Sequence, residues 1–382
     1  MGMTIGLCYD LRSEYLEMGY SEEETAEFDR DDTVKAIEDA LSFLGHRPER
    51  IGHARQLAAA LVAGKRWDLV FNIAEGMHGI GREAQVPALL DLYEIPYTFS
   101  DPLVMSLTLH KGMTKRVIRD AGIPTSDFRI VEDAEDTQNL AFDPPYFIKP
   151  VAEGTGKGVT PDSIIRDRSL LPSACQRMLE TFRQPVLVEP YLSGREFTTA
   201  VVGTGKKAQV LGSMEVHLKE SAEQGVYSYV NKEKCEELVI YRLVKAADDP
   251  VVAQAEAIAL NAWKVLGCRD AAALIRQTVR ESPCLRKSTH CRHSSGTFGS
   301  AHYLQSSEVV TVYRFDWPIV ASASERIRRK KPDAHCHCPR QGKGFGSADA
   351  QTGRLVVKTA LFFGAYSGNH GMHPESGADK RS

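Results

Sequence analysis

A glycine-rich segment at residues 153–159 is the part of the chain that most directly indicates chemistry. Its ligand-binding candidates are Gly154, Gly156, Lys157 and Gly158. Glycines let a backbone approach a ligand closely, and successive amide groups can bind phosphate oxygens. The spacing is not that of a Walker A motif, and such a segment alone could be an ordinary turn. It follows an expected strand that carries Lys149, however, so a cation and a phosphate cradle would meet at one end of a sheet.

Two acidic residues lie farther along the chain, where a second strand is expected to end. Glu189 follows an apolar run, and Glu196 follows a short turn. A carboxylate at a strand end can accept a hydrogen bond from an exocyclic amine, and one a few residues later can bind a ribose hydroxyl. Either residue alone is more typical of an exposed carboxylate.

Three more lysines could add positive charge to such a site. Lys111 and Lys115 are one helical turn apart, a spacing that usually marks a solvated helix face. Lys232 lies in a polar stretch after Tyr227 and would ordinarily be a surface charge. These residue types alone therefore do not distinguish a binding site from a surface.

The elements that must position these residues alternate between strands and helices. In the first hundred residues we expect strands at 4–9, 49–51 and 68–72, and helices at 31–44, 54–63 and 83–93. Alternation of this kind indicates a parallel sheet. Farther on we expect helices at 111–121 and 251–265, strands at 128–131, 145–151 and 185–189, and an antiparallel pair at 196–202 and 209–216. The fold class is therefore α/β.

These residues together resemble the ATP-grasp fold, and specifically D-alanine–D-alanine ligase and its close relatives. The resemblance covers residues 3–271 and implies a parallel-sheet domain before the ATP-grasp core. Seven sequence blocks appear in the family's order: residues 71–76, 81–87, 95–98, 147–150 with the glycine-rich segment, 189–192, 194–198 and 267–270. One departure is Phe99, because relatives usually have glycine after Tyr-Thr; this puts the local turn in question.

The resemblance implies ATP as a cofactor and a role for each matching residue. The phosphates would be bound by Lys111, Lys149 and Lys232, under a loop formed by Gly154, Gly156, Lys157 and Gly158. Adenine would meet Glu189 and Leu192, and the ribose would meet Glu196. The amino-acid pocket would contain the catalytic candidates Glu75, His78 and Thr155. The implied reaction phosphorylates the carboxylate of one amino acid, and the amine of a second attacks the acyl phosphate.

The metal site of the family is missing from its expected place. The resemblance implies Mg²⁺, held by an Arg-x-Asp segment after residues 268–270 and by a later Glu-Val-Asn-Pro segment. Neither is present, so no metal ligand is assigned. Composition changes at about residue 271: the last 112 residues hold four of the eight cysteines and seven of the twelve histidines.

A shifted reading frame could explain this loss. If residues 272–275 were encoded GCC GCA TTG ATT, the frame starting at the last base of the first codon would read Arg-Ile-Asp. Residues 285–292, as TTG AGG AAG TCA ACC CAT TGC CGG, would read Glu-Glu-Val-Asn-Pro-Leu in that same frame. We therefore expect residues 271–318 to be frameshifted. The Cys/His cluster at 335–338 then indicates no zinc site, because its spacing fits no tetrahedral pattern, and the basic run at 326–331 indicates no nucleic-acid surface.

Composition bounds the remaining expectations. The 382 residues carry a net charge of −3, which gives no electrostatic case for nucleic-acid binding. No apolar run is long enough to span a membrane, and no signal-peptide pattern is seen, so we expect a cytoplasmic protein with reduced thiols. The expected partners are small-molecule amino-acid substrates, with a homodimer left open beside a monomer.

The expected domains are an N-terminal substrate domain at 1–105, a central ATP-grasp subdomain at 106–190, a C-terminal one at 191–326, and an unstructured tail at 327–382. Three alternatives to the ligase stay open. They are an ATP-grasp ligase for another carboxylate and amine, a non-catalytic nucleotide-binding relative, and the destabilised product of a damaged gene.

Overall fold

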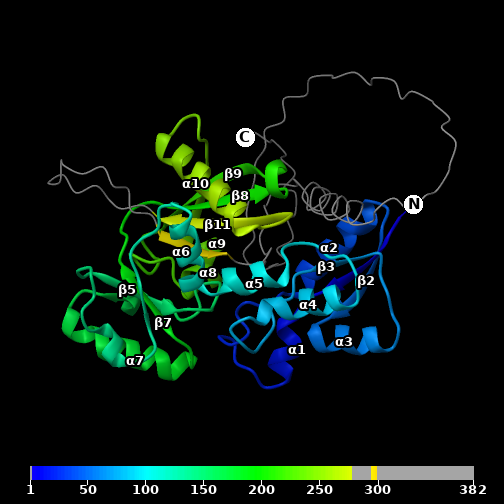
Figure 1. Cartoon of the computed structure of the whole chain (residues 1–382), viewed down its shortest axis with the longest axis horizontal. Coiled ribbons are helices and arrows are strands. Elements are labelled where there is room, and N and C mark those ends of the chain that lie inside the picture. The colour runs from blue at the N-terminus through cyan, green and yellow to red at the C-terminus, as the bar shows by residue number, and fades with distance from the viewer. Residues whose placement is uncertain (1, 278–293, 299–382) are drawn as a thin grey trace, which may run out of the picture.

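The computed structural model describes residues 2–277 and 294–298, and its N-terminal part is built on a parallel sheet (Figure 1). The sheet has the order β2-β1-β3, and every pair is parallel, as predicted. Its strands are β1 (Thr4–Cys8), β2 (Arg47–Gly52) and β3 (Leu69–Asn72). An isolated parallel bridge between Val70 and Tyr97 continues the sheet beyond β3.

Helices cover both faces of this sheet, which explains why β1 and β3 are largely apolar, whereas the edge strand β2 is polar. On one face Val34 and Leu41 pack with the β1 residues Ile5 and Leu7. On the other face Leu57, Leu61 and Leu90 pack with Val70. The helices are α1 (Arg12–Glu17), α2 (Asp31–Phe43), α3 (Ala54–Val62) and α4 (Gln85–Leu92), the last preceded by a 3₁₀ turn at Arg82–Ala84.

Two helices connect this part to a central antiparallel sheet. They are α5 (Pro102–Leu109), which lies next to the N-terminal part, and α6 (Lys111–Asp120), which lies among the later elements of the chain (Figure 1). The sheet has the order β4-β7-β5-β6, with β4 (Arg129–Val131), β5 (Tyr146–Pro150), β6 (Ile164–Ile165) and β7 (Val186–Pro190). Helix α7 (Leu171–Phe182) packs on it through Leu171, Ala174 and Cys175.

A second antiparallel sheet, with the order β10-β9-β8-β11-β12, forms the C-terminal part. Its strands are β8 (Glu196–Val202), β9 (Gln209–Leu218), β10 (Val239–Val244), β11 (Ala271–Gln277) and β12 (Ser294–Phe298). Helix α10 (Pro250–Leu266) packs on this sheet and places the buried Trp263 against Val201. The short helices α8 (Tyr229–Glu233) and α9 (Cys235–Leu238) occupy the connection between β9 and β10.

Strand β11 follows the last block that carries the family resemblance. Each of its residues pairs with one of β8, from Ala271 with Val202 to Gln277 with Glu196. The chain therefore continues the sheet after Asp270. Most of the segment expected to be frameshifted, and the whole expected tail at 327–382, lies outside the described residues. The domain boundaries stay predictions; the three sheets take their strands from residues 4–72, 129–190 and 196–298.

The turn at Phe99 is left-handed, which explains why glycine would suit it. Phe99 has a φ of 68°, and its ring is buried at 5.5 Å from that of Phe71. The Phe99 N–H donates to Asp270 Oδ2 at 2.8 Å. The turn is thus held by a core contact and by a carboxylate from the start of β11.

Among the described residues, none of the helices has the length and apolar character needed to cross a bilayer.

Candidate nucleotide site

Lys111 lies at the first position of α6, where the fold buries its side chain. The residue is 5% exposed, and its Nζ donates to the backbone carbonyl of Glu153. Burial, together with the nearby charge of Lys149, lowers the pKa of Lys111 to about 7. A buried ammonium of this kind is costly unless it meets negative charge, so it is suited to binding an anion.

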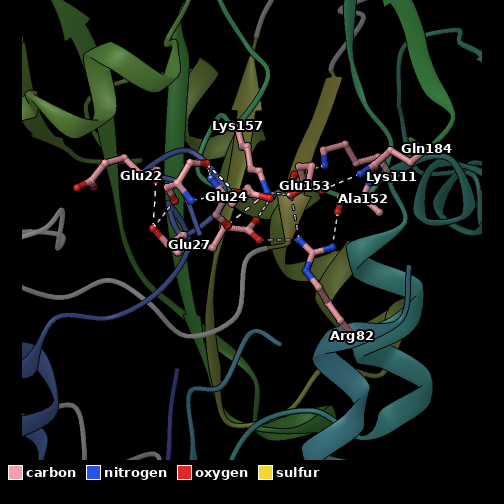
Figure 2. Close-up of polar contacts among 12 residues, drawn as sticks. Glu22, Glu24, Glu27, Arg82, Lys111, Ala152, Glu153, Lys157 and Gln184 are labelled. Atoms are coloured by element: carbon pink, nitrogen blue, oxygen red, sulfur yellow. Dashed lines mark hydrogen bonds and ion pairs between the residues drawn. The ribbon is translucent and has the colours of Figure 1, made fainter. Parts of the chain in front are cut away.

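The Glu153 carboxylate collects contacts from three directions at the start of the glycine-rich segment (Figure 2). Arg82 Nη2 lies 3.2 Å and Lys157 Nζ 3.1 Å from Glu153 Oε2. Gln184 Nε2 donates to Oε1 at 2.7 Å. The predicted phosphate-binding Lys157 is therefore paired with a carboxylate, and it would have to exchange this partner to contact a phosphate.

Arg82 and Glu27 connect the N-terminal domain to the same segment. Arg82 lies 2.6 Å from Glu27 Oε2 and donates to the carbonyl of Ala152 at 2.7 Å. The Gly154 N–H donates to Glu27 Oε1. Sequence reasoning missed both residues. Arg82 lies within the block 81–87, but only the fold reveals that it is 6% exposed and bound to two carboxylates.

The glycine-rich segment has the backbone that its composition predicts. Gly156 and Gly158 have φ values of 80° and 74°, a region that favours glycine. A Cβ on Gly158 would lie 2.7 Å from the ring of Phe182. Thr155 also has positive φ, at 45°, and its buried Oγ1 has no hydrogen-bond partner among the described residues. That oxygen is therefore available to a ligand.

Glu189 is buried between two lysines rather than exposed. Lys115 Nζ lies 2.9 Å from its Oε2 and Lys149 Nζ 2.7 Å from its Oε1. Burial alone would raise the pKa of Glu189, but the two ammonium groups hold it down at about 2. The expectation that Lys115 belongs to a solvated face is wrong, because its side chain is 0% exposed. Its helical spacing gave no sign of the partner, which comes from β7.

Lys232 and Glu196 reach the same region from the C-terminal sheet. Lys232 Nζ lies 4.8 Å from the centre of the Tyr227 ring. Burial lowers the pKa of Lys232 to about 8, opposed by Glu196 and assisted by Lys149. Burial also raises the pKa of Glu196 to about 6. Leu192 is 4% exposed, just beyond the end of β7.

The catalytic candidates lie in different surroundings. Glu75 is 5% exposed and close to Glu83, another buried carboxylate. Burial, reinforced by Glu75 and Glu27, raises the pKa of Glu83 well above its usual value. His78 is exposed and lies 3.3 Å from the hydroxyl of Tyr20. Their roles stay predictions.

The arrangement is suited to a polyphosphate. Lys149 acts electrostatically on both Lys111 and Lys232, so three lysines from β5, α6 and α8 converge. Backbone amides of a glycine-rich turn lie next to them. Three ammonium groups and a turn of amides match the charge and geometry of phosphate oxygens. Among the described residues, no group of three or more His, Cys, Asp or Glu side chains is arranged to hold a metal ion.

The fold and these lysines define an ATP-grasp protein. D-alanine–D-alanine ligase from Bacillus anthracis, solved in complex with ATP, has the same fold, with a TM-score of 0.61. The similarity covers 86% of this chain and 100% of that one, at 17% identity. A model of the D-ala D-ala ligase C-terminus matches residues 117–276.

Sequence similarity then identifies the family. The chain is 34% identical to D-alanine–D-alanine ligase of Methylobacterium radiotolerans over 236 residues, which are 62% of this chain and 72% of that protein. It is 32% identical to the Sinorhizobium fredii enzyme over 61% of this chain and 72% of that protein. The chain belongs to the D-alanine–D-alanine ligase family, and the predicted resemblance is confirmed.

Proposed function

We propose that this chain is an ATP-dependent ligase that joins two amino acids of the D-alanine type through an acyl phosphate, for peptidoglycan precursor synthesis. The observation that carries the proposal is the convergence of Lys111, Lys149 and Lys232 beside the glycine-rich segment. Family membership supports the same reaction, because the relatives are named D-alanine–D-alanine ligases.

The residues of this site would act mainly by positioning and by neutralising charge. ATP supplies the phosphoryl group that activates one carboxylate. Lys149 is held in place by Glu189, and Lys111 by the Glu153 carbonyl, so their side-chain nitrogens are oriented before the nucleotide arrives. Lys232 comes from a separate segment and would bind the terminal phosphate. Adenine would pack near Leu192, and Glu196 would accept hydrogen bonds from the ribose.

The substrate side of the site would be formed by Glu75, His78 and Thr155. The Thr155 Oγ1, unpartnered among the described residues, could donate a hydrogen bond to a reacting oxygen. Beside Glu75, burial raises the pKa of the Glu83 carboxyl well above its usual value, which favours its neutral form.

Release of ADP in the presence of D-alanine tests the proposal. We expect the wild-type chain to release ADP and phosphate with D-alanine as the sole amino acid. Lys232→Ala should weaken ATP binding by about tenfold, the loss of roughly one charge-assisted contact. The matched control is Lys206→Ala, because Lys206 is an exposed lysine of the same sheet region. Equal effects of the two variants would contradict the proposed site.

A non-catalytic nucleotide-binding relative is the second candidate. The observation that favours it is the lack of a magnesium cluster among the described residues. Nucleotide binding without ADP release, at any magnesium concentration, would establish it. Release of ADP with other amino acids but not with D-alanine would instead identify a ligase for another carboxylate and amine.

We further propose that the protein works in the cytoplasm with Mg²⁺ and assembles as a homodimer. Large apolar side chains support the dimer: Val62 on α3 is 80% exposed, and Leu92 on the adjacent α4 is 76% exposed. Sedimentation of the full chain and of Val62→Glu would test it, because a charge at an interface should yield monomers.

A further inference from the structure

An ion pair joins the N-terminal domain to the segment that carries Lys232. We call residues 219–238 the closing loop; it contains α8 and α9. Arg12 Nη1, at the start of α1, lies 3.2 Å from Oε2 of Glu233, 221 residues later in the chain. Glu233 directly follows Lys232 on α8, so a contact to one fixes the backbone of the other.

Arg12 is itself firmly placed. Its backbone N–H donates to the carbonyl of Asp29 at 2.8 Å. Its Nη2 lies 2.7 Å from Glu22 Oε2 and donates to the Glu22 carbonyl. The side chain is only 18% exposed, whereas that of Glu233 is 38% exposed. Although burial alone would lower the pKa of Arg12, Glu233 raises it, so Arg12 stays charged at every ordinary pH.

The closing loop lies directly on the glycine-rich segment. The Tyr229 N–H donates to the carbonyl of Val159 at 3.2 Å. A Cβ on Gly156 would be 3.2 Å from the Tyr229 nitrogen and 3.3 Å from Lys232 Cδ. The closing loop and the glycine-rich segment are therefore in direct contact beside Lys232.

Internal hydrogen bonds make the loop a unit. The buried Asn231 side chain donates to the carbonyls of Glu223 and Val226, at 2.8 and 2.9 Å. Ser228 accepts from the Asn231 N–H and caps α8. Because these hydrogen bonds hold the closing loop together, a single contact at Glu233 can fix the position of the whole loop.

We propose that Arg12 is a positioning residue that, through Glu233, holds the closing loop over the glycine-rich segment and thereby places Lys232 at the terminal phosphate. The proposal rests on the proposed function only for the identity of the ligand. Arg12 itself does not touch the nucleotide. Its effect should therefore discriminate between ligands that have and lack the phosphate that Lys232 binds.

Two measurements on the full chain test this inference. Hydrogen exchange followed by mass spectrometry reports the opening of the closing loop without any ligand. Affinities for ATP and for ADP report the placement of Lys232. The variants are Arg12→Ala, Glu233→Ala and their double. Matched controls are Arg50→Ala, another N-terminal arginine bound by two carboxylates, and Glu237→Ala, another exposed glutamate of the loop.

We expect Arg12→Ala and Glu233→Ala to speed exchange in residues 229–238 by about two- to fivefold, the range of a partly exposed ion pair. The double variant should exchange no faster than either single one. In the wild-type background, Arg12→Ala should lower the affinity for ATP more than the affinity for ADP. In a Lys232→Ala background, Arg12→Ala should lower the two affinities equally. Both controls should match the wild type.

Unchanged loop exchange in Arg12→Ala, additive effects in the double variant, or equal losses for ATP and ADP would overturn the inference. If the wild type binds neither nucleotide, the proposed function fails. The exchange comparison, made without ligand, would then still decide whether Arg12 holds the closing loop.

Discussion

Burial divides the lysines of this site into two functional kinds. Lys115 has a carboxylate partner in Glu189 and serves the fold, whereas Lys111 is buried with a backbone carbonyl and stays available to an anion. The same residue type at positions one helical turn apart thus has two roles, and the partner in the fold decides between them.

Nucleotide binding should take up protons. Lys111 has a pKa of about 7, so its side chain is largely neutral in the free protein at about pH 8. Lys232 has a pKa of about 8, so about half of its side chains are neutral at that pH. Phosphate favours the ammonium form and raises both pKa values. ATP affinity should therefore fall as pH rises above about 7. Calorimetry in Tris and HEPES should reveal uptake of about one proton, reduced in Lys111→Met; identical enthalpies in the two buffers would contradict this.

Replacing Glu189 should destabilise the fold. Glu189→Gln would leave Lys115 buried without its counter-charge, at a cost of about 3–5 kcal/mol of unfolding free energy. Adding Lys115→Met should recover most of that loss. In the wild type the pKa of Glu189 is lowered from 4.5 to about 2, so its contribution is complete above pH 4.5 and disappears as the pH falls towards 2. Urea unfolding measures each step, and an unaffected single variant would disprove the pairing.

At the scale of elements, the contact between two loops controls access to the site. Gly156 has a φ of 80° and faces the Tyr229 backbone, so Gly156→Ala combines left-handed strain with crowding of α8. We expect ATP affinity to fall by about tenfold, with an unfolding free energy lower by about 1–2 kcal/mol. Gly205→Ala is a control for strain alone, because its φ is 58° and a Cβ would meet no atom within 4 Å. An equal loss of ATP affinity in Gly205→Ala would show that crowding of α8 does not cause the loss in Gly156→Ala.

The left-handed turn at Phe99 predicts that two variants, Phe99→Gly and Phe99→Ala, differ in stability in an unusual order. Phe99→Ala should cost about 3–5 kcal/mol because it empties a core position. Phe99→Gly loses the same ring but relieves about 1–2 kcal/mol of left-handed strain. Glycine should therefore be less destabilising than alanine here, the reverse of the usual order. Chemical denaturation of the two variants gives the answer directly, and a more stable alanine variant would mean that the turn is not strained.

Sequence patterns predicted five of the longer helices but missed α5 and α7, as well as the shortest helices. The helix expected at 31–44 is observed at Asp31–Phe43, because its apolar spacing is strong enough to stand alone. Helices α1, α8 and α9 were not predicted, since they have four to six residues and depend on tertiary contacts such as that of Arg12. The family resemblance singled out Lys111, Lys149 and the glycine-rich segment, whereas the contacts of Arg82, Glu27 and Lys115 depend on partners distant in the sequence.

At the scale of the molecule, Asp270 fastens the N-terminal domain to the C-terminal sheet. It is 0% exposed, it accepts from the Phe99 N–H through Oδ2, and its own carbonyl accepts from the Gly203 N–H at 2.7 Å. Asp270→Ala should remove about 1–3 kcal/mol by leaving the Phe99 amide unpaired. It should also separate the unfolding of the two parts in calorimetry. A single unchanged transition would rule out this coupling.

The position of β11 has a consequence for how the chain is made. The N-terminal sheet uses residues 4–72, so it can form soon after they leave the ribosome. One edge of β8 instead remains unpaired until β11 has been synthesised, because β11 begins at Ala271, about seventy residues after β8 ends. At about 5–20 residues per second, translation leaves that edge open for several seconds. An open strand edge invites pairing with other chains, so ribosome-bound intermediates that end before β11 are the stage at which this protein is most exposed to misassembly.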